Sequence, residues 1–143
     1  MSSIEHNDWI YNESALIEPP EGYVGFIYLV TLPDGRFYVG KKLFNFRKTR
    51  QVKGKKKRYL AESDWKTYYG SSDEVKKVLN EEGPLNFKRE ILHLCKTKGE
   101  LNYMETWEIF KRQALLSEQY VNGWVSAKIH KSTVIKAVNK DNL

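Results

Sequence analysis

The sequence is poor in cysteine and has no long apolar run. Cys95 is the only cysteine among 143 residues, which excludes an intrachain disulfide and a zinc site built from cysteines. No stretch approaches the roughly 18 consecutive apolar residues that suggest a membrane-spanning helix. The first residues, Met1 to Glu5, lack the basic start and apolar segment of a secretory signal. We therefore expect a cytoplasmic protein with no membrane partner.

Charge is distributed unevenly along the chain. The formal net charge is +6, but residues 1–22 have five acidic residues and no basic one. Residues 41–67 have eleven basic residues against two acidic ones, and residues 126–143 add a further +3. A segment as basic as 41–67 attracts a polyanion by releasing counterions, and nucleic acid is the commonest polyanion. A solvated basic loop is the alternative interpretation.

Hydrophobic patterning predicts a β-hairpin followed by a third strand. Residues 23–32 and 36–39 are rich in β-branched and aromatic side chains, and they flank the turn Pro33-Asp34-Gly35. Residues 87–95 alternate partly between apolar and polar side chains, which favours a further strand. We therefore expect an α+β fold, with a short central three-stranded antiparallel sheet flanked by helices.

Two capping boxes predict where the main helices begin. Ser71 precedes Glu74 by three residues, and Thr97 precedes Glu100 by the same spacing, each before apolar residues at helical intervals. A short helix is also expected over residues 43–50. We expect one domain, because the chain has enough apolar residues for a single core.

The composition changes along the chain suggest its organisation. Residues 1–22 read as an acidic N-terminal arm, and residues 23–125 form the domain. A basic insertion lies at about residues 51–69, and residues 126–143 form a basic C-terminal tail. Within the domain, residues 121–125 are expected to add a short strand.

Two short motifs resemble the pair that names the GIY-YIG nucleases. Gly25-Phe26-Ile27-Tyr28 precedes Tyr38-Val39-Gly40 at hairpin spacing, with Phe26 where glycine is usual in the family's first motif. Residues 86–92 resemble the third strand of that family. Residues 101–111 resemble its metal-binding helix, with Glu105 in the position of the glutamate ligand. The resemblance implies a small GIY-YIG-like domain.

The same resemblance implies an activity and the roles of several residues. The expected reaction is divalent-metal-dependent hydrolysis of DNA phosphodiester bonds, with Tyr28 as the base and Tyr38 orienting the proton relay. Glu105 would bind Mg²⁺ or Mn²⁺. Lys41 or Lys42 beside a tyrosine would favour its phenolate form, because a nearby positive charge stabilises the ionised form. An arginine after the second motif would contact the scissile phosphate, and Arg47 is the first choice.

Further contacts to nucleic acid are expected around these residues. Gly40 has no side chain, so a phosphate could approach its backbone closely. The basic candidates are Lys42, Lys48, Arg50, Lys53, Lys55, Lys56, Lys57 and Arg58. Arg50 is also the rival of Arg47, and Glu108 is the rival of Glu105. Asn122 is the candidate substitute for the family's final-strand asparagine, since Val125 stands where that residue would fall.

The resemblance favours a standalone endonuclease of the restriction or phage type, with DNA as partner and no organic cofactor. A homodimer would allow both strands to be cut. Two alternatives remain open: a non-catalytic nucleic-acid-binding module with the same fold, and a nuclease directed at RNA. Taken singly, strand tyrosines are typical core residues and a helix glutamate is typically a surface residue. Only the combination of Tyr28, Tyr38, Gly40 and Glu105 favours the enzyme.

Overall fold

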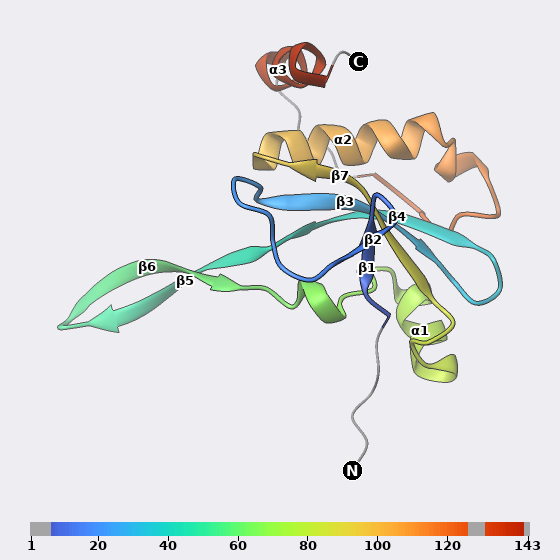
Figure 1. Cartoon of the computed structure of the whole chain (residues 1–143), viewed down its shortest axis with the longest axis horizontal. Helices are drawn as coiled ribbons and strands as arrows, with labels where there is room; N and C mark the ends of the chain where they lie inside the picture. The colour runs from blue at the N-terminus through green and yellow to red at the C-terminus, as the bar shows by residue number, and fades with distance from the viewer. Residues whose placement is uncertain (1–6, 126–130, 142–143) are drawn as a thin grey trace.

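The computed structural model describes residues 7–125 and 131–141. It has a mixed five-stranded sheet in the order β2-β1-β7-β3-β4 and a separate two-stranded ribbon (Figure 1). The sheet contains β1 (Trp9–Tyr11), β2 (Ser14–Leu16), β3 (Gly25–Thr31), β4 (Phe37–Leu43) and β7 (Lys88–Cys95). The remaining strands and the helices are β5 (Asn45–Val52), β6 (Lys55–Glu62), α1 (Asp73–Glu82), α2 (Lys98–Lys111) and α3 (Lys131–Asp141).

The sheet is wider than the sequence predicted. The expected hairpin and third strand are present as β3, β4 and β7, which pair antiparallel. Residues 9–16, which we grouped with the acidic arm, add β1 and β2 and run β1 parallel to β7. The three predicted strands are therefore antiparallel as expected, but the sheet has five strands rather than three and is mixed. The reason is the burial of Trp9, which is 1% exposed and whose ring centroid lies 4.9 Å from that of Phe26.

Helices cover both faces of the sheet (Figure 1). Successive side chains of a strand point to opposite faces, so Ile27 packs in the cluster with Met104 of α2, whereas Tyr28 packs in the cluster with Val75 of α1. Both faces of β3 are thus buried, which explains its continuous apolar sequence. Helix α3 lies against α2. The Tyr28 side chain and helix α2 therefore lie on opposite sides of the sheet.

The segment after β4 is a β-ribbon, and the short helix expected over residues 43–50 is wrong. Strands β5 and β6 pair antiparallel from Asn45–Glu62 to Val52–Lys55. Lys53 and Gly54 between them both have positive φ, 50° and 77°, as a two-residue hairpin turn with the twist of its strands requires. The ribbon projects away from the body of the molecule (Figure 1).

Both predicted helices are present, and one of the two starts at its predicted cap. Thr97 accepts a hydrogen bond from the Glu100 amide at 3.0 Å, as expected. Helix α1 begins one residue later than its capping box suggests, because Ser72 rather than Ser71 accepts from the Val75 amide.

The C-terminal region differs from the sequence expectation. The strand expected over residues 121–125 is wrong, because these residues form no strand. The only β-pairing in this part of the described chain is an isolated bridge between Phe37 and Tyr120, just before them. Of the predicted basic tail, residues 131–141 form α3, and the rest lies outside the described residues. Within the described part of the chain, no helix is both long and apolar enough to cross a membrane.

Candidate active site

Tyr28 and Tyr38 lie side by side on neighbouring strands. The register pairs Tyr28 with Gly40 and Tyr38 with Val30, which makes the two tyrosines diagonal neighbours on one face of the sheet. Their ring centroids are 6.1 Å apart. Tyr28 is 1% exposed, whereas Tyr38 is partly exposed and its hydroxyl lies 3.1 Å from the Ser71 hydroxyl. The hairpin register therefore brings the two motif tyrosines together.

Two glycines make room for these tyrosines. A Cβ atom on Gly40 would overlap the Tyr28 hydroxyl. A Cβ on Gly70, where φ is +124°, would lie 2.9 Å from the Tyr38 ring and 3.4 Å from the Tyr28 hydroxyl. The open space that we expected a phosphate to use at Gly40 is thus filled by Tyr28 on this face of β4. The glycine therefore serves the packing of the tyrosine, and a phosphate contact at the Gly40 backbone stays a prediction.

A third tyrosine, Tyr68, completes the cluster. Its ring centroid lies 6.0 Å from that of Tyr28, and the Lys42 ammonium lies 4.0 Å from the Tyr68 ring centroid. In the sequence, Tyr68 was only one of several aromatic residues flanking the basic segment. Nothing in the sequence distinguishes it from those aromatic residues, because only the structure shows that Gly70, two residues later, packs against Tyr38.

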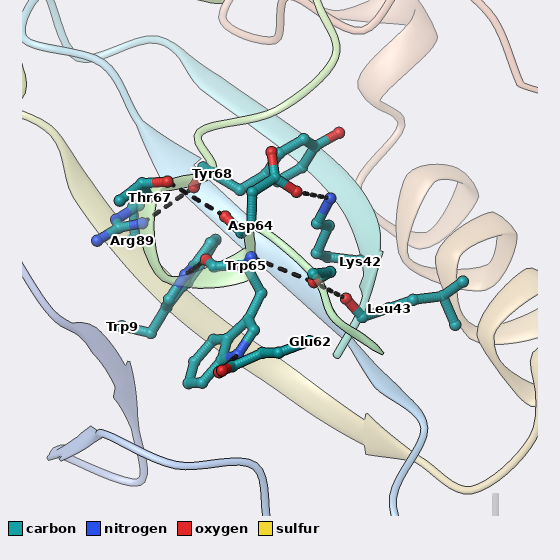
Figure 2. Close-up of polar contacts among 10 residues, drawn as sticks. Trp9, Lys42, Leu43, Glu62, Asp64, Trp65, Thr67, Tyr68 and Arg89 are labelled. Atoms are coloured by element: carbon teal, nitrogen blue, oxygen red, sulfur yellow. Dashed lines mark hydrogen bonds and ion pairs between the residues drawn. The ribbon is translucent and has the colours of Figure 1, made fainter. Parts of the chain in front are cut away.

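The segment that carries Tyr68 is fixed by hydrogen bonds from the sheet (Figure 2). The buried Arg89 guanidinium of β7 donates to the carbonyls of Lys66 and Tyr68, at 2.9 Å and 3.0 Å. From β4, the Lys42 ammonium donates to the Asp64 carboxylate at 2.6 Å, and this bond lowers the pKa of Asp64. Contacts from two strands therefore hold the backbone on which Tyr68 depends.

Glu105 and Lys41 reach the same place from the other face. β4 is the outer strand of the sheet, and a cavity of about 620 Å³ at its edge is lined by Tyr28, Tyr38, Tyr68, Lys41 and Glu105, among others. The Lys41 ammonium lies 3.8 Å from the Glu105 carboxylate and also donates to the Asn102 side chain. Groups from both faces thus meet at the edge of β4.

Burial raises the pKa values of both motif tyrosines, Tyr28 and Tyr38. The pKa of Tyr28 is raised well above 10, first by burial and then by the nearby Tyr38, Tyr68 and Glu105. Burial also raises the pKa of Tyr38, and the bond with Ser71 opposes this shift. The groups that act on Tyr28 raise its pKa, so the protein alone does not supply the phenolate that we expected Lys41 or Lys42 to favour.

Glu105 suits a single hard cation. Burial raises its pKa, while the positive charge of Lys41 opposes the shift. Mg²⁺ is usually bound through one or two carboxylates, with waters and substrate phosphates completing its shell. Among the described residues, no three His, Cys, Asp or Glu side chains gather into a metal cage. Asp73 and Glu74 of α1 also line the cavity, but they do not join Glu105 in such a cage. Glu105 at the edge of a roomy cavity therefore fits the cation that the sequence predicts.

Glu108, the rival ligand, is engaged on another side of α2. Its carboxylate lies 2.9 Å from His93 and 2.7 Å from Arg112, and its side chain is 3% exposed. Although burial opposes ionisation, these hydrogen bonds lower the pKa of Glu108 to about 2. It does not line the cavity. The geometry separates the two glutamates and favours Glu105.

Asn122 lines the cavity but is bound to the sheet backbone. Its side-chain amide donates to the Val39 carbonyl at 2.8 Å and accepts from the Val39 amide at 3.0 Å. The side chain thus pairs with the outer edge of β4 as a strand would. Asn122 therefore positions the C-terminal segment against the site.

The predicted arginines lie outside the cavity. Arg47 and Arg50 are exposed on β5, and neither lines the cavity. Because side chains alternate along a strand, Arg50 lies on the same face of the ribbon as Phe46, and Arg47 lies on the opposite face. The cation that lines the cavity is Lys41. The other predicted contacts on the ribbon are exposed, and these are Lys48, Lys53, Lys55, Lys56, Lys57 and Arg58.

Comparison with known proteins gives one family match. The model described as "Putative endonuclease segE, GIY-YIG domain" matches residues 9–125. The match begins at β1 rather than at residue 23, where the motif resemblance begins, and it includes the whole ribbon. No curated protein and no solved structure matches the chain.

Proposed function

The chain belongs to the SegE GIY-YIG endonuclease-domain family, and from this premise we propose that it is a divalent-metal-dependent endonuclease acting on DNA. The observation that carries the proposal is the meeting of Tyr28, Tyr38, Lys41 and Glu105 at one cavity. These residues come from three elements and both faces of the sheet. A purely structural role for each residue would not require them to converge.

The cavity offers groups for the main requirements of phosphodiester hydrolysis. The reaction needs an activated water, neutralisation of charge on the phosphoryl oxygens and help for the leaving oxygen. Glu105 would hold Mg²⁺ or Mn²⁺, which when bound lowers the pKa of a water ligand and neutralises phosphoryl charge. Lys41 is the proposed phosphate contact, in the role that we first gave to Arg47.

Tyr28 is the proposed proton acceptor, and Tyr38 is the residue proposed to orient the proton relay. Tyr28 must lose its own proton before it accepts another, and its raised pKa opposes this. Neutralising the Glu105 carboxylate removes one of the influences that raise this pKa. Lys41 beside Glu105 would then act on the tyrosine without an opposing negative charge.

Nicking of supercoiled plasmid tests this proposal. Wild-type protein should convert the plasmid to the open circle with Mg²⁺ or Mn²⁺ and should not do so with a chelator. Parallel reactions on single-stranded RNA and duplex RNA decide whether RNA is the substrate. If no nucleic acid is cut with either metal, the chain is a binding module with a nuclease fold. Because each chain has one such site, a double-strand cut would require a homodimer or two separate events.

A further inference from the structure

The ribbon β5–β6 has no part in the reaction proposed above, yet it is the most basic region of the molecule. We propose that it is an arm that inserts into the major groove of B-form duplex DNA. This inference rests on the proposed function for its placement beside a cleaved phosphate. It goes further in naming the substrate as B-form duplex and the ribbon as the element that selects it.

The dimensions of the ribbon suit a groove. Each strand has eight residues, so the arm is about 26 Å long at roughly 3.3 Å per residue. A major groove of B-form DNA, roughly 12 Å wide, admits a two-stranded ribbon. The side chains of residues 45–51 and 55–60 are all exposed. Both faces of the ribbon are thus available for contacts.

Positive charge lies on both of those faces. Residues 45–62 have eight basic residues and one acidic residue. By the pairing register, one face carries Lys48, Arg50, Lys55 and Lys57, and the other carries Arg47, Lys56 and Arg58. A ribbon lying on one strand of phosphates would need charge on one face only. A ribbon inserted between two phosphate walls would need it on both.

The charges act against the stability of the free ribbon. Arg50 lies directly opposite Lys57 in the register, and like charges at such a position are destabilising. A two-stranded ribbon outside a larger sheet is itself marginally stable in water. Phosphates on either side would relieve the repulsion. The sequence therefore keeps a feature that favours a polyanion at a cost to the free protein.

The base of the ribbon leads directly to the cavity. The Lys42 ammonium lies 4.8 Å from the Phe46 ring centroid of β5 and 4.0 Å from the Tyr68 ring centroid. Tyr68 lines the cavity with Tyr28 and Glu105. A duplex with its phosphate in the cavity would thus lie within reach of the ribbon. At about 3.4 Å per base pair, the arm would span roughly eight base pairs from the cut.

Groove geometry discriminates among nucleic acids. The major groove of A-form RNA is too deep and narrow for side chains to read, and a single strand has no such groove. The ribbon should therefore select duplex DNA over duplex RNA of the same sequence. Simple charge attraction would not produce this preference, because both duplexes carry the same phosphates.

The test measures binding by the full chain with Glu105→Ala and without metal, so that nothing is cut. A shortened variant replaces residues 49–58 with Asn-Gly and preserves the pairing of Lys48 with Tyr59. It lacks six basic side chains, so the slope of log affinity against log salt should fall by about five units. The preference for duplex DNA over duplex RNA should disappear. A control with Lys76→Gln and Lys77→Gln, exposed on α1, should keep that preference.

Two further measurements keep the inference falsifiable. Methylation of guanine N7, a major-groove atom, should interfere with binding within roughly eight base pairs of the cut for the long ribbon only. If the shortened variant fails to fold, Arg50→Gln with Lys57→Gln removes the repulsion and should lower the salt slope by about two units.

The outcomes separate the two proposals. Equal affinity for the two duplexes, or binding that guanine methylation does not disturb, overturns the groove arm. If wild-type protein cuts DNA but the shortened variant keeps the preference, the arm is also wrong while the enzyme stands. If no cutting occurs but the preference depends on the ribbon, the arm stands and the proposed activity falls.

Discussion

At the residue scale, the surroundings of Tyr28 determine what its hydroxyl can do. The side chain is buried between Gly40 and the rings of Tyr38 and Tyr68. Burial, and then the nearby Tyr38, Tyr68 and Glu105, raise its pKa well above 10. In the protein alone Tyr28 is therefore a neutral phenol at neutral pH. Its use as a base requires a lower pKa, which we expect only when metal and DNA are bound at the cavity.

This state of Tyr28 predicts a pH dependence for cleavage. Below the pKa of a phenol, the fraction of phenolate rises about tenfold per pH unit, so the rate should rise with pH from 6 to 9. Tyr28→Phe should lower the rate by about 100-fold or more and flatten the profile, whereas Tyr38→Phe should keep the slope. Single-turnover rates on plasmid DNA measure both. A Tyr28→Phe variant with an unchanged rate and slope would show that Tyr28 is not the base.

Gly40 offers a test of the packing itself. Gly40→Ala places a methyl group on the Tyr28 hydroxyl, and such overpacking typically costs about 1–3 kcal/mol. We expect urea unfolding to show that loss and cleavage to fall more than stability alone explains. Tyr28→Phe in the same chain should recover part of the lost stability, since it removes the overlapping oxygen. Gly123→Ala is the control, because no atom lies within 4 Å of its Cβ position.

At the element scale, helix α2 presents two glutamates to different surroundings. Glu105 meets Lys41 at a cavity, while Glu108 is buried between His93 and Arg112. The three-residue spacing turns them to neighbouring sides of the helix. One carboxylate is thus left near solvent and substrate, and the other ties α2 to β7 and to its own last turn.

Glu108→Gln should therefore destabilise the protein in a pH-dependent manner. The pKa of Glu108 is lowered to about 2 from 4.5, so its contribution is present above pH 4.5 and is lost as the pH falls toward 2. At ~1.4 kcal/mol per pKa unit the wild type should be about 3 kcal/mol more stable at pH 7. Urea unfolding of both proteins at pH 7 and pH 3 measures the difference. A difference that does not shrink at pH 3 would contradict the assignment.

The sequence predicts the elements whose signals are local. The composition of residues 25–31 and 37–43 and the turn at residues 33–35 predict the hairpin. Thr97 predicts the start of α2. β1 has only three residues, and it depends on the burial of Trp9 in the tertiary structure. The ribbon shows no alternation of apolar and polar residues because both of its faces are exposed.

The site residues also divide into those that the sequence predicts and those that it does not. Tyr28, Tyr38 and Glu105 can be named from the motifs and their spacing, and the structure places them at one cavity. Tyr68 cannot be named in this way, since its position depends on a loop held by Arg89 from a distant strand. Arg47 lies outside the cavity because the segment after β4, expected to be a helix, is a ribbon that projects outward.

At the scale of the whole molecule, charge and site share one edge of the sheet. β4, which leads along the chain into the basic ribbon, lies at one end of the strand order, and β2, within the acidic segment 1–22, lies at the other. The modest net charge of +6 thus conceals a strongly basic side next to the cavity. A polyanion would be drawn to that side, and its approach should weaken with salt.

One measurement tests the central claim most directly: Mg²⁺-dependent nicking of supercoiled plasmid by wild type, Glu105→Gln and Glu108→Gln, with DNA binding measured in parallel. Wild type should cut with Mg²⁺ and lose activity when the metal is chelated. Glu105→Gln should bind DNA as wild type does and cut about 100-fold more slowly or not at all. Glu108→Gln should keep its activity at temperatures where it is folded. Cutting by Glu105→Gln at the wild-type rate, or a wild type that never cuts, would contradict the account.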